Sequence, residues 1–200
     1  AESISDYLHK YEYASRRHIE FRVIWDCGLR IGALRSLDRE DFVRDHPDFG
    51  THLRLEDRVD QGTGLKNGSK SERRVFIRPE TEEVLDAWIA NRRPETTDEY
   101  GRRPLLTTQN GRVSEDAVKK DMQRATAPCF VGNPCEGCNE DNHNRKCPEA
   151  LSPHPIRRGA ITRDLNEGMI PEHVSERYDT GVEVIKRHYD ARSSGDKMRV

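Results

Sequence analysis

Apolar residues recur every three or four positions in several stretches of this chain, which is the spacing of an amphipathic helix. The first stretch predicts a helix over about residues 15 to 28 that ends at Gly28. Its apolar positions are Ile19, Val23, Ile24 and Cys27. A short second helix is expected from Ile31 to Leu37, so Arg30 would lie at the junction between two helices.

The following part of the chain has a pattern typical of strands. Residues 51–59 and 73–78 have alternating or β-branched character, and the residues after Leu37 look like the entry to another strand. Turn chemistry between the two segments comes from Gly62, Gly64 and Gly68. The pattern therefore predicts a small antiparallel sheet with a loop that carries Lys66 and Lys70.

Helical spacing returns in the second half of the chain. An apolar stripe predicts a helix over residues 81–91, in which Trp88 packs in the core rather than lining a ligand site. Ser114 is in position to cap a further helix. Thr180 begins a capping-box pattern, which predicts a last helix that starts there and carries Tyr189 three turns in.

Length and composition indicate one domain. Two hundred residues suffice for a core, and 33% hydrophobic against 35% charged residues predict helices with two distinct faces.

No apolar run reaches the length of a membrane span, and the first residues carry no signal-peptide pattern. We therefore expect no membrane partner and a cytoplasmic, nucleoid-associated location. The chain starts at Ala1 and stops at Val200, so we expect a fragment of a longer protein.

The charge distribution allows a nucleic-acid partner despite a formal net charge of −2. Residues 61–79 hold five basic residues and one acidic residue, whereas residues 35–60 hold eight acidic and five basic residues. One face could therefore be positive while another is acidic, although a run of charges is often only a solvated edge.

Two arginines and a tyrosine carry the chemistry of a phosphodiester exchange. The guanidinium groups of Arg30 and Arg157 could hold the non-bridging oxygens while charge builds on them. The hydroxyl of Tyr189 could attack phosphorus and retain the DNA end as a covalent ester. Each residue alone would be an ordinary surface or packing residue, so the prediction depends on their order, context and spacing.

The local sequences around these residues resemble the catalytic domain of the tyrosine recombinases, the phage integrase family. The matching elements are Gly28-Leu29-Arg30, His154-Pro155-Ile156-Arg157 and Arg187-His188-Tyr189, in this order over nearly the whole chain. The resemblance implies an α+β fold, mainly helical with a small antiparallel three-stranded sheet, as in DNA breaking-rejoining enzymes. It implies one catalytic domain over residues 1–200, without the separate N-terminal domain that clamps DNA in this family, so this fragment alone should bind weakly.

The resemblance also implies a set of site residues and partners. The catalytic residues would be Arg30, Lys70, His154, Arg157 and Tyr189. In the family a lysine between the second and third strands acts as general acid, and Lys70, seven residues before Ile77, matches this pattern better than the alternative, Lys66. Weaker DNA contacts are expected at Lys66, Lys119, Lys120 and Arg158. The partner would be double-stranded DNA, with a tetramer on paired recombination sites and a monomer for the fragment alone.

Two positions depart from the family pattern. Thr180 stands nine residues before Tyr189, where the family has histidine or tryptophan, and Ala33 replaces an acidic residue that commonly follows the first arginine by three positions. We expect retained chemistry, with His154 acting as general base toward Tyr189 because its ordinary pKa lies near neutrality.

Residues 129–147 form a Cys/His-rich insertion. Its spacing approaches that of a zinc knuckle, and the predicted ligands are Cys135, Cys138, His143 and Cys147, with Cys129 able to replace one of them. The alternative is a polar loop with incidental cysteines. A zinc ion here would be structural, because we expect the reaction to need no cofactor beyond the arginines and the lysine.

Three functions remain open on the sequence. The favoured one is a site-specific recombinase that integrates or excises mobile DNA through a 3′-phosphotyrosyl intermediate. A type IB topoisomerase would use the same residues to relax supercoils. A non-catalytic, zinc-bearing DNA-binding module is the third, and Thr180 and Ala33 are its main support.

Overall fold

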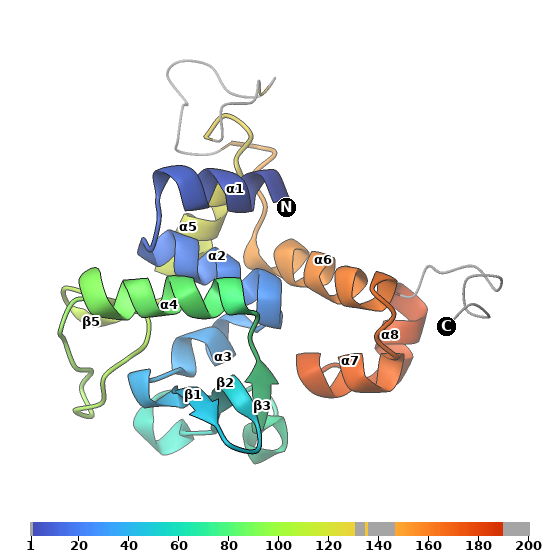
Figure 1. Cartoon of the computed structure of the whole chain (residues 1–200), viewed down its shortest axis with the longest axis horizontal. Coiled ribbons are helices and arrows are strands. Elements are labelled where there is room, and N and C mark those ends of the chain that lie inside the picture. The colour runs from blue at the N-terminus through green and yellow to red at the C-terminus, as the bar shows by residue number, and fades with distance from the viewer. Residues whose placement is uncertain (1, 131–134, 136–146, 190–200) are drawn as a thin grey trace.

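The computed structural model describes residues 2–130, 135 and 147–189, which form eight α-helices and a small sheet at one edge of the molecule (Figure 1). The helices are α1 Glu2–Tyr11, α2 Arg16–Cys27, α3 Ile31–Ser36, α4 Pro79–Asn91, α5 Glu115–Thr126, α6 Pro153–Asn166, α7 Pro171–Tyr178 and α8 Val182–His188. The strands are β1 Phe42–His46, β2 Gly50–Leu55, β3 Arg73–Phe76, β4 Thr107–Thr108 and β5 Gly111–Arg112.

The main sheet is antiparallel and has the order β1-β2-β3. Leu53 at its centre lies opposite Phe42 on one side and Val75 on the other, and all three side chains are buried. β4 and β5 form a separate two-stranded ribbon. The predicted α+β class, mainly helical with a three-stranded antiparallel sheet, is confirmed.

The main core forms around α2, which packs against α1, α4, α5 and α6. This central position explains why apolar side chains are buried on several sides of α2 rather than along one stripe. Trp88 of α4 lies in the same core, where its indole nitrogen donates to the Leu105 carbonyl at 2.9 Å. Its predicted structural role is confirmed.

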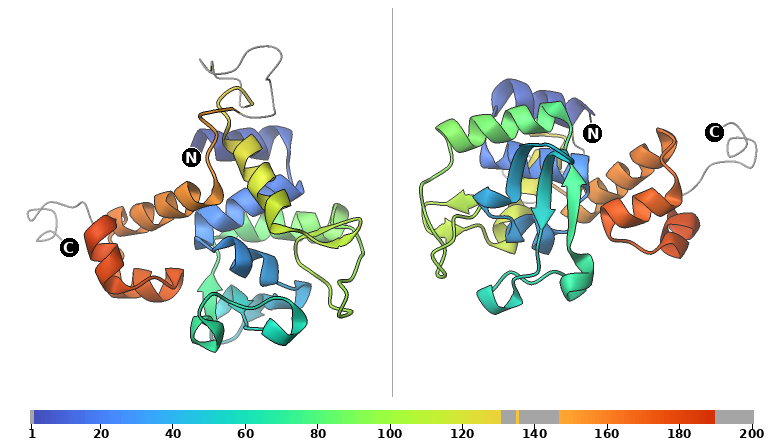
Figure 2. Two further views of the ribbon diagram at one scale, coloured as in Figure 1. Left: turned by 180° about the vertical axis from the view of Figure 1, so that it is seen from behind. Right: turned by 60° about the horizontal axis from the view of Figure 1, so that its bottom comes forward.

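A second, smaller cluster joins α6, α7 and α8, which stand to one side of the other elements (Figure 2). Its buried residues are Ala160, Ile161, Leu165, Val174, Tyr178 and Ile185. Trp25 of α2 packs against both clusters and so connects the three helices to the main body. Among the described residues, no helix combines the length and apolarity needed to cross a bilayer.

Several predicted boundaries are confirmed. Ser15 caps α2, Gly28 ends it in the left-handed region with φ 56°, and Ser114 caps α5 by accepting from the Ala117 amide. β2 ends at Leu55, earlier than predicted, because the following loop folds back and the Asp57 carboxylate accepts from the Leu65 amide at 2.6 Å.

The predicted start of the last helix is wrong. α8 begins at Val182, Gly181 precedes it, and no side chain caps it. The Thr180 hydroxyl instead accepts a hydrogen bond from the Arg157 guanidinium at 2.5 Å. This bond is charge-assisted and therefore stronger than a capping bond from a neutral backbone amide. Tyr189 therefore lies at the C-terminal end of a helix of about two turns, not three turns into it.

Candidate active site

Arg30 lies at the predicted helix junction, directly before α3. The left-handed conformation of Gly28 allows the chain to leave α2 and turn there. A Cβ atom on Gly28 would lie 2.0 Å from Cε1 of Tyr178, so the close approach of α7 also requires glycine at this position. The position of Arg30 thus depends on packing between α2 and the end of α7.

Arg157 comes from the first half of α6, which begins at Pro153, and its side chain is buried. Its guanidinium donates to the carbonyls of Gly28 and Tyr178 and to the Thr180 hydroxyl. Burial, followed by the nearby guanidinium of Arg30, lowers the pKa of Arg157 to about 10, so it remains a cation at neutral pH. Three of its five N–H donors have these acceptors, and the residue is only 4% exposed.

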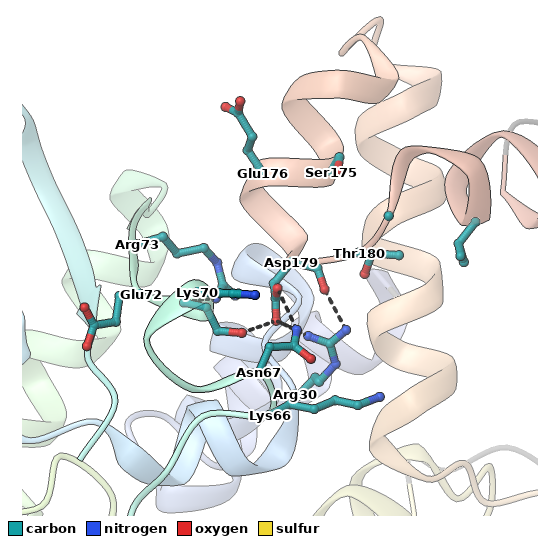
Figure 3. Close-up of a pocket in the computed structure, with 13 residues that line it drawn as sticks. Arg30, Lys66, Asn67, Lys70, Glu72, Arg73, Ser175, Glu176, Asp179 and Thr180 are labelled. Carbon is teal, nitrogen blue, oxygen red and sulfur yellow. Dashed lines mark hydrogen bonds and ion pairs between the residues drawn. The ribbon is translucent and has the colours of Figure 1, made fainter. Parts of the chain in front are cut away.

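Asp179 is the main contact of Arg30. One terminal nitrogen of Arg30 donates to the Asp179 carboxylate, and the other donates to the Asp179 carbonyl at 2.6 Å. The same carboxylate accepts from the Ser71 hydroxyl at 2.9 Å and from the Asn67 amide at 3.3 Å (Figure 3). Arg30 is therefore fixed on one edge, and three of its five N–H donors remain for a ligand.

These residues line an open cavity of about 750 Å³ between the β2–β3 loop and the α7–α8 turn. Four basic side chains line this cavity. Arg30 comes from the α2–α3 junction, Lys66 and Lys70 come from the β2–β3 loop, and Arg73 begins β3. Acidic side chains at its wall are Glu72, Glu176 and Asp179. Four basic and three acidic side chains leave the lining with a net charge of +1, so any preference for an anionic ligand comes from the local placement of Arg30 and the lysines.

The two candidate lysines both lie in the β2–β3 loop, as predicted. Lys70 belongs to a short 3-10 turn, Gly68–Ser71, and Lys66 precedes it. Both are exposed and line the cavity. The charge of Lys66 is also one of the causes that lower the pKa of His154. The choice of Lys70 over Lys66 stays a prediction, because both lysines line the same cavity.

His154 lies in the first turn of α6, where its side chain is exposed. Desolvation lowers the pKa of His154 below its ordinary value, and the charges of neighbouring cations lower it further. The cations are Arg157, Arg158, Arg30 and Lys66. His154 is therefore predominantly neutral at pH 7, the form that can accept a proton.

Tyr189 lies at the end of α8, half-buried against the cluster formed by α6, α7 and α8. The guanidinium of Arg158 lies 5.9 Å from the centroid of its ring. Ionised Tyr189 would raise the pKa of Arg157, which requires the phenol to lie within electrostatic reach of that guanidinium. Tyr189 therefore lies near Arg157, but neither of these residues nor His154 lines the cavity beside Arg30.

The remaining predicted contact residues are less closely connected. Lys119 and Lys120 are exposed on α5, and Lys119 pairs with Glu115 at 3.7 Å and Asp116 at 3.4 Å. Their predicted contact with DNA stays a prediction, as does that of Arg158.

The predicted zinc ligands lie partly outside the described residues. Cys138 and His143 are outside them, whereas the sulfur atoms of Cys135 and Cys147 lie 3.4 Å apart. Within the described part of the chain, no group of three or more potential ligands is arranged to hold a metal ion. The close pair of thiols fits two ligands of one soft metal, and the zinc site stays a prediction.

Three residues of this site have no motif in the sequence that points to them, namely Asp179, Ser71 and Asn67. Ala33 carries no acid, and Asp179 supplies the carboxylate that contacts Arg30. Asp179 has φ 48° and ends α7, a position where aspartate is common for backbone reasons alone. The available signal was an aspartate directly before Thr180, and its importance becomes visible only when the loop of Ser71 lies beside it.

No protein-family model matches this sequence, and no curated protein matches it significantly. Solved structures do match. XerA recombinase is 15% identical with a TM-score of 0.66, and the match covers 98% of this chain and 58% of that one. The integrase of transposon Tn1549 in complex with transposon right end DNA is 17% identical with a TM-score of 0.67, covering 99% and 61%. XerH site-specific recombinase bound to difH substrate is 16% identical with a TM-score of 0.66, covering 100% and 50%.

The chain therefore spans between half and about three-fifths of the length of these three proteins. At these identities the similarity establishes the fold. The chain has the fold of the recombinase and integrase structures that it matches over nearly all of its length.

Proposed function

We propose that this chain is the catalytic part of a site-specific DNA recombinase that cuts and rejoins strands through a 3′-phosphotyrosyl intermediate on Tyr189. The solved proteins with the same fold are a transposon integrase and two recombinases, and two of these three structures contain DNA. Double-stranded DNA is accordingly the proposed substrate, with a tetramer on paired sites as the working assembly in the cytoplasm.

One observation carries the proposal: Arg30 and Arg157 both donate to the short segment Tyr178–Thr180. Lys66 and Lys70 line the same cavity as Arg30, and the charges of Arg157, Arg30 and Lys66 lower the pKa of His154. Cationic and proton-accepting groups from distant segments therefore lie close together, which supports a shared phosphate ligand.

The proposed reaction is a transesterification at one DNA phosphate. The Tyr189 oxygen forms a bond to phosphorus, and the bond from phosphorus to the 5′ oxygen breaks. His154 takes the phenol proton, and Lys70 or Lys66 gives a proton to the departing 5′ oxygen. The unused N–H donors of Arg30 and Arg157 bind the non-bridging oxygens as their charge increases. Attack of a 5′ hydroxyl from another strand reverses these steps and reseals the DNA.

A pool of nicked duplexes with randomised sequence tests this proposal. Each duplex carries a 5′ label on the strand to be cut, so cleavage transfers the labelled fragment to the protein, and the adduct is detected on a denaturing gel. We expect an adduct with the wild-type protein and with Tyr100→Phe, which changes an exposed tyrosine away from the cavity. We expect none with Tyr189→Phe.

Other outcomes identify the alternatives. DNA binding without any adduct would overturn the catalytic proposal in favour of a DNA-binding module. An adduct with Tyr189→Phe would refute the choice of nucleophile. Relaxation of a supercoiled plasmid irrespective of its sequence, with no strand exchange, would identify a type IB topoisomerase.

A further inference from the structure

Two guanidinium groups, Arg30 and Arg73, line the cavity, and the buried guanidinium of Arg157 lies close enough to repel both. Arg30 lowers the pKa of both Arg73 and Arg157, after desolvation, which is the largest cause for each. Asp179 acts in the opposite direction on both groups and pairs directly with Arg30. One carboxylate is thus the shared counter-ion of three arginines.

The carboxylate of Asp179 is itself fixed by groups from other parts of the chain. Ser71 is buried and donates its hydroxyl hydrogen bond at 2.9 Å, and Asn67 donates from its amide at 3.3 Å. Both belong to the β2–β3 loop, whereas Arg30 follows α2 (Figure 3). The contacts therefore join the lysine-bearing loop, the α7–α8 turn and the α2–α3 junction at one point.

The role of Asp179 as the end of α7 does not require these contacts. A left-handed residue at a helix end needs only the appropriate backbone conformation, which glycine or asparagine adopts as well as aspartate. An acid that served only this purpose would point into solvent. Instead its side chain is 17% exposed and accepts three donors, one of them a guanidinium.

We propose that Asp179 is a positioning residue for Arg30, held by Ser71 and Asn67, so that one edge of the guanidinium is fixed and the other is presented to the DNA phosphate. The inference deepens the proposed function and rests on it for the identity of the ligand. It also links Arg30 mechanically to the loop of Lys66 and Lys70, so the phosphate-binding group and the proton donor move together.

The first test does not depend on catalysis. Phenylglyoxal modifies guanidinium groups, and hydrogen bonding to a carboxylate protects them, so the modification rate of Arg30 reports on its contact with Asp179. Mass spectrometry would give this rate for wild type, Asp179→Asn and Asp179→Gly, both of which tolerate φ 48°. We expect both variants to accelerate modification at least threefold, and Ser71→Ala to accelerate it less.

Glu176→Gln is the matched control, because Glu176 lines the same cavity and carries the same charge but has no hydrogen bond to Arg30 in the described structure. In Glu176→Gln, the rate at which phenylglyoxal modifies Arg30 should equal the rate in wild type. Equal rates in wild type and both Asp179 variants would overturn the inference, whether or not the protein cleaves DNA.

The second test uses the labelled nicked duplexes. We expect Asp179→Asn to reduce the single-turnover rate of adduct formation about tenfold or more, while the Kd for DNA stays equal or decreases because a negative charge is lost. A cleavage rate that rises together with affinity would show that Asp179 competes with the phosphate, and would overturn the positioning role. If wild type forms no adduct, the proposed function fails. The modification rates still test whether Asp179 holds Arg30.

Discussion

Gly28→Ala should destabilise the protein strongly, because this residue meets two independent constraints. Its φ of 56° is strained for alanine, which costs roughly 1 kcal/mol. In addition, the new Cβ would lie 2.0 Å and 2.2 Å from two ring carbons of Tyr178, distances that require the ring to move.

The second cost follows from the surroundings of Tyr178. Its ring is fully buried, and its hydroxyl donates to Asp164 at 2.6 Å. Displacing a buried aromatic ring and its hydrogen bond to a carboxylate costs on the order of 3 kcal/mol. The total loss in free energy of unfolding is therefore about 4 kcal/mol, which corresponds to a decrease in Tm of roughly 12 °C for a chain of this length.

Urea denaturation of matched variants measures this difference. Gly101→Ala is the control, since φ at Gly101 is 75° and no atom beyond the two adjacent residues lies within 4 Å of the position that an alanine Cβ would take; it should cost only about 1 kcal/mol. Gly28→Ala should also cost only about 1 kcal/mol in a Tyr178→Ala background, because the clash is gone. Equal losses for Gly28→Ala and Gly101→Ala in the wild-type background would refute the reasoning.

Three further predictions concern the site and the metal. The adduct-forming rate should be constant near pH 7 and fall only below the ordinary histidine pKa of about 6.5, since the pKa of His154 is lowered; His154→Gln should remove this acid limb. Replacing the general acid, which is either Lys66 or Lys70, by alanine should slow cleavage by about 10²-fold or more. A substrate with sulfur in place of the departing 5′ oxygen should restore the rate of this variant but not that of the other lysine variant, because a thiolate leaves without a proton. Protein purified without chelator should contain about one zinc ion per chain by elemental analysis, reduced in Cys135→Ser and Cys147→Ser; zinc-free wild type would end this prediction.

Local patterns were sufficient for most of the secondary structure. The left-handed end of α2 at Gly28 and the Ser114 cap follow from interactions within a few residues, and the three strands have alternating or β-branched residues, so the sequence predicted them. The last helix was predicted to begin at Thr180, and this failed for a tertiary reason. Arg157, 23 residues earlier, donates a hydrogen bond to the Thr180 hydroxyl, which would otherwise be free to cap the helix.

The sequence by itself determined the α+β fold, through short-range spacing and the family resemblance, and it supplied the candidate residues for phosphodiester chemistry, because residue type and motif order carry this information. Only the tertiary structure decided how these residues are held. Asp179 gained its position beside Arg30 from the packing of α7 against α2 and from Ser71 in the β2–β3 loop, more than a hundred residues away. Such a contact has no local pattern, because its energy depends on the burial and mutual repulsion of charges that meet only in the folded chain.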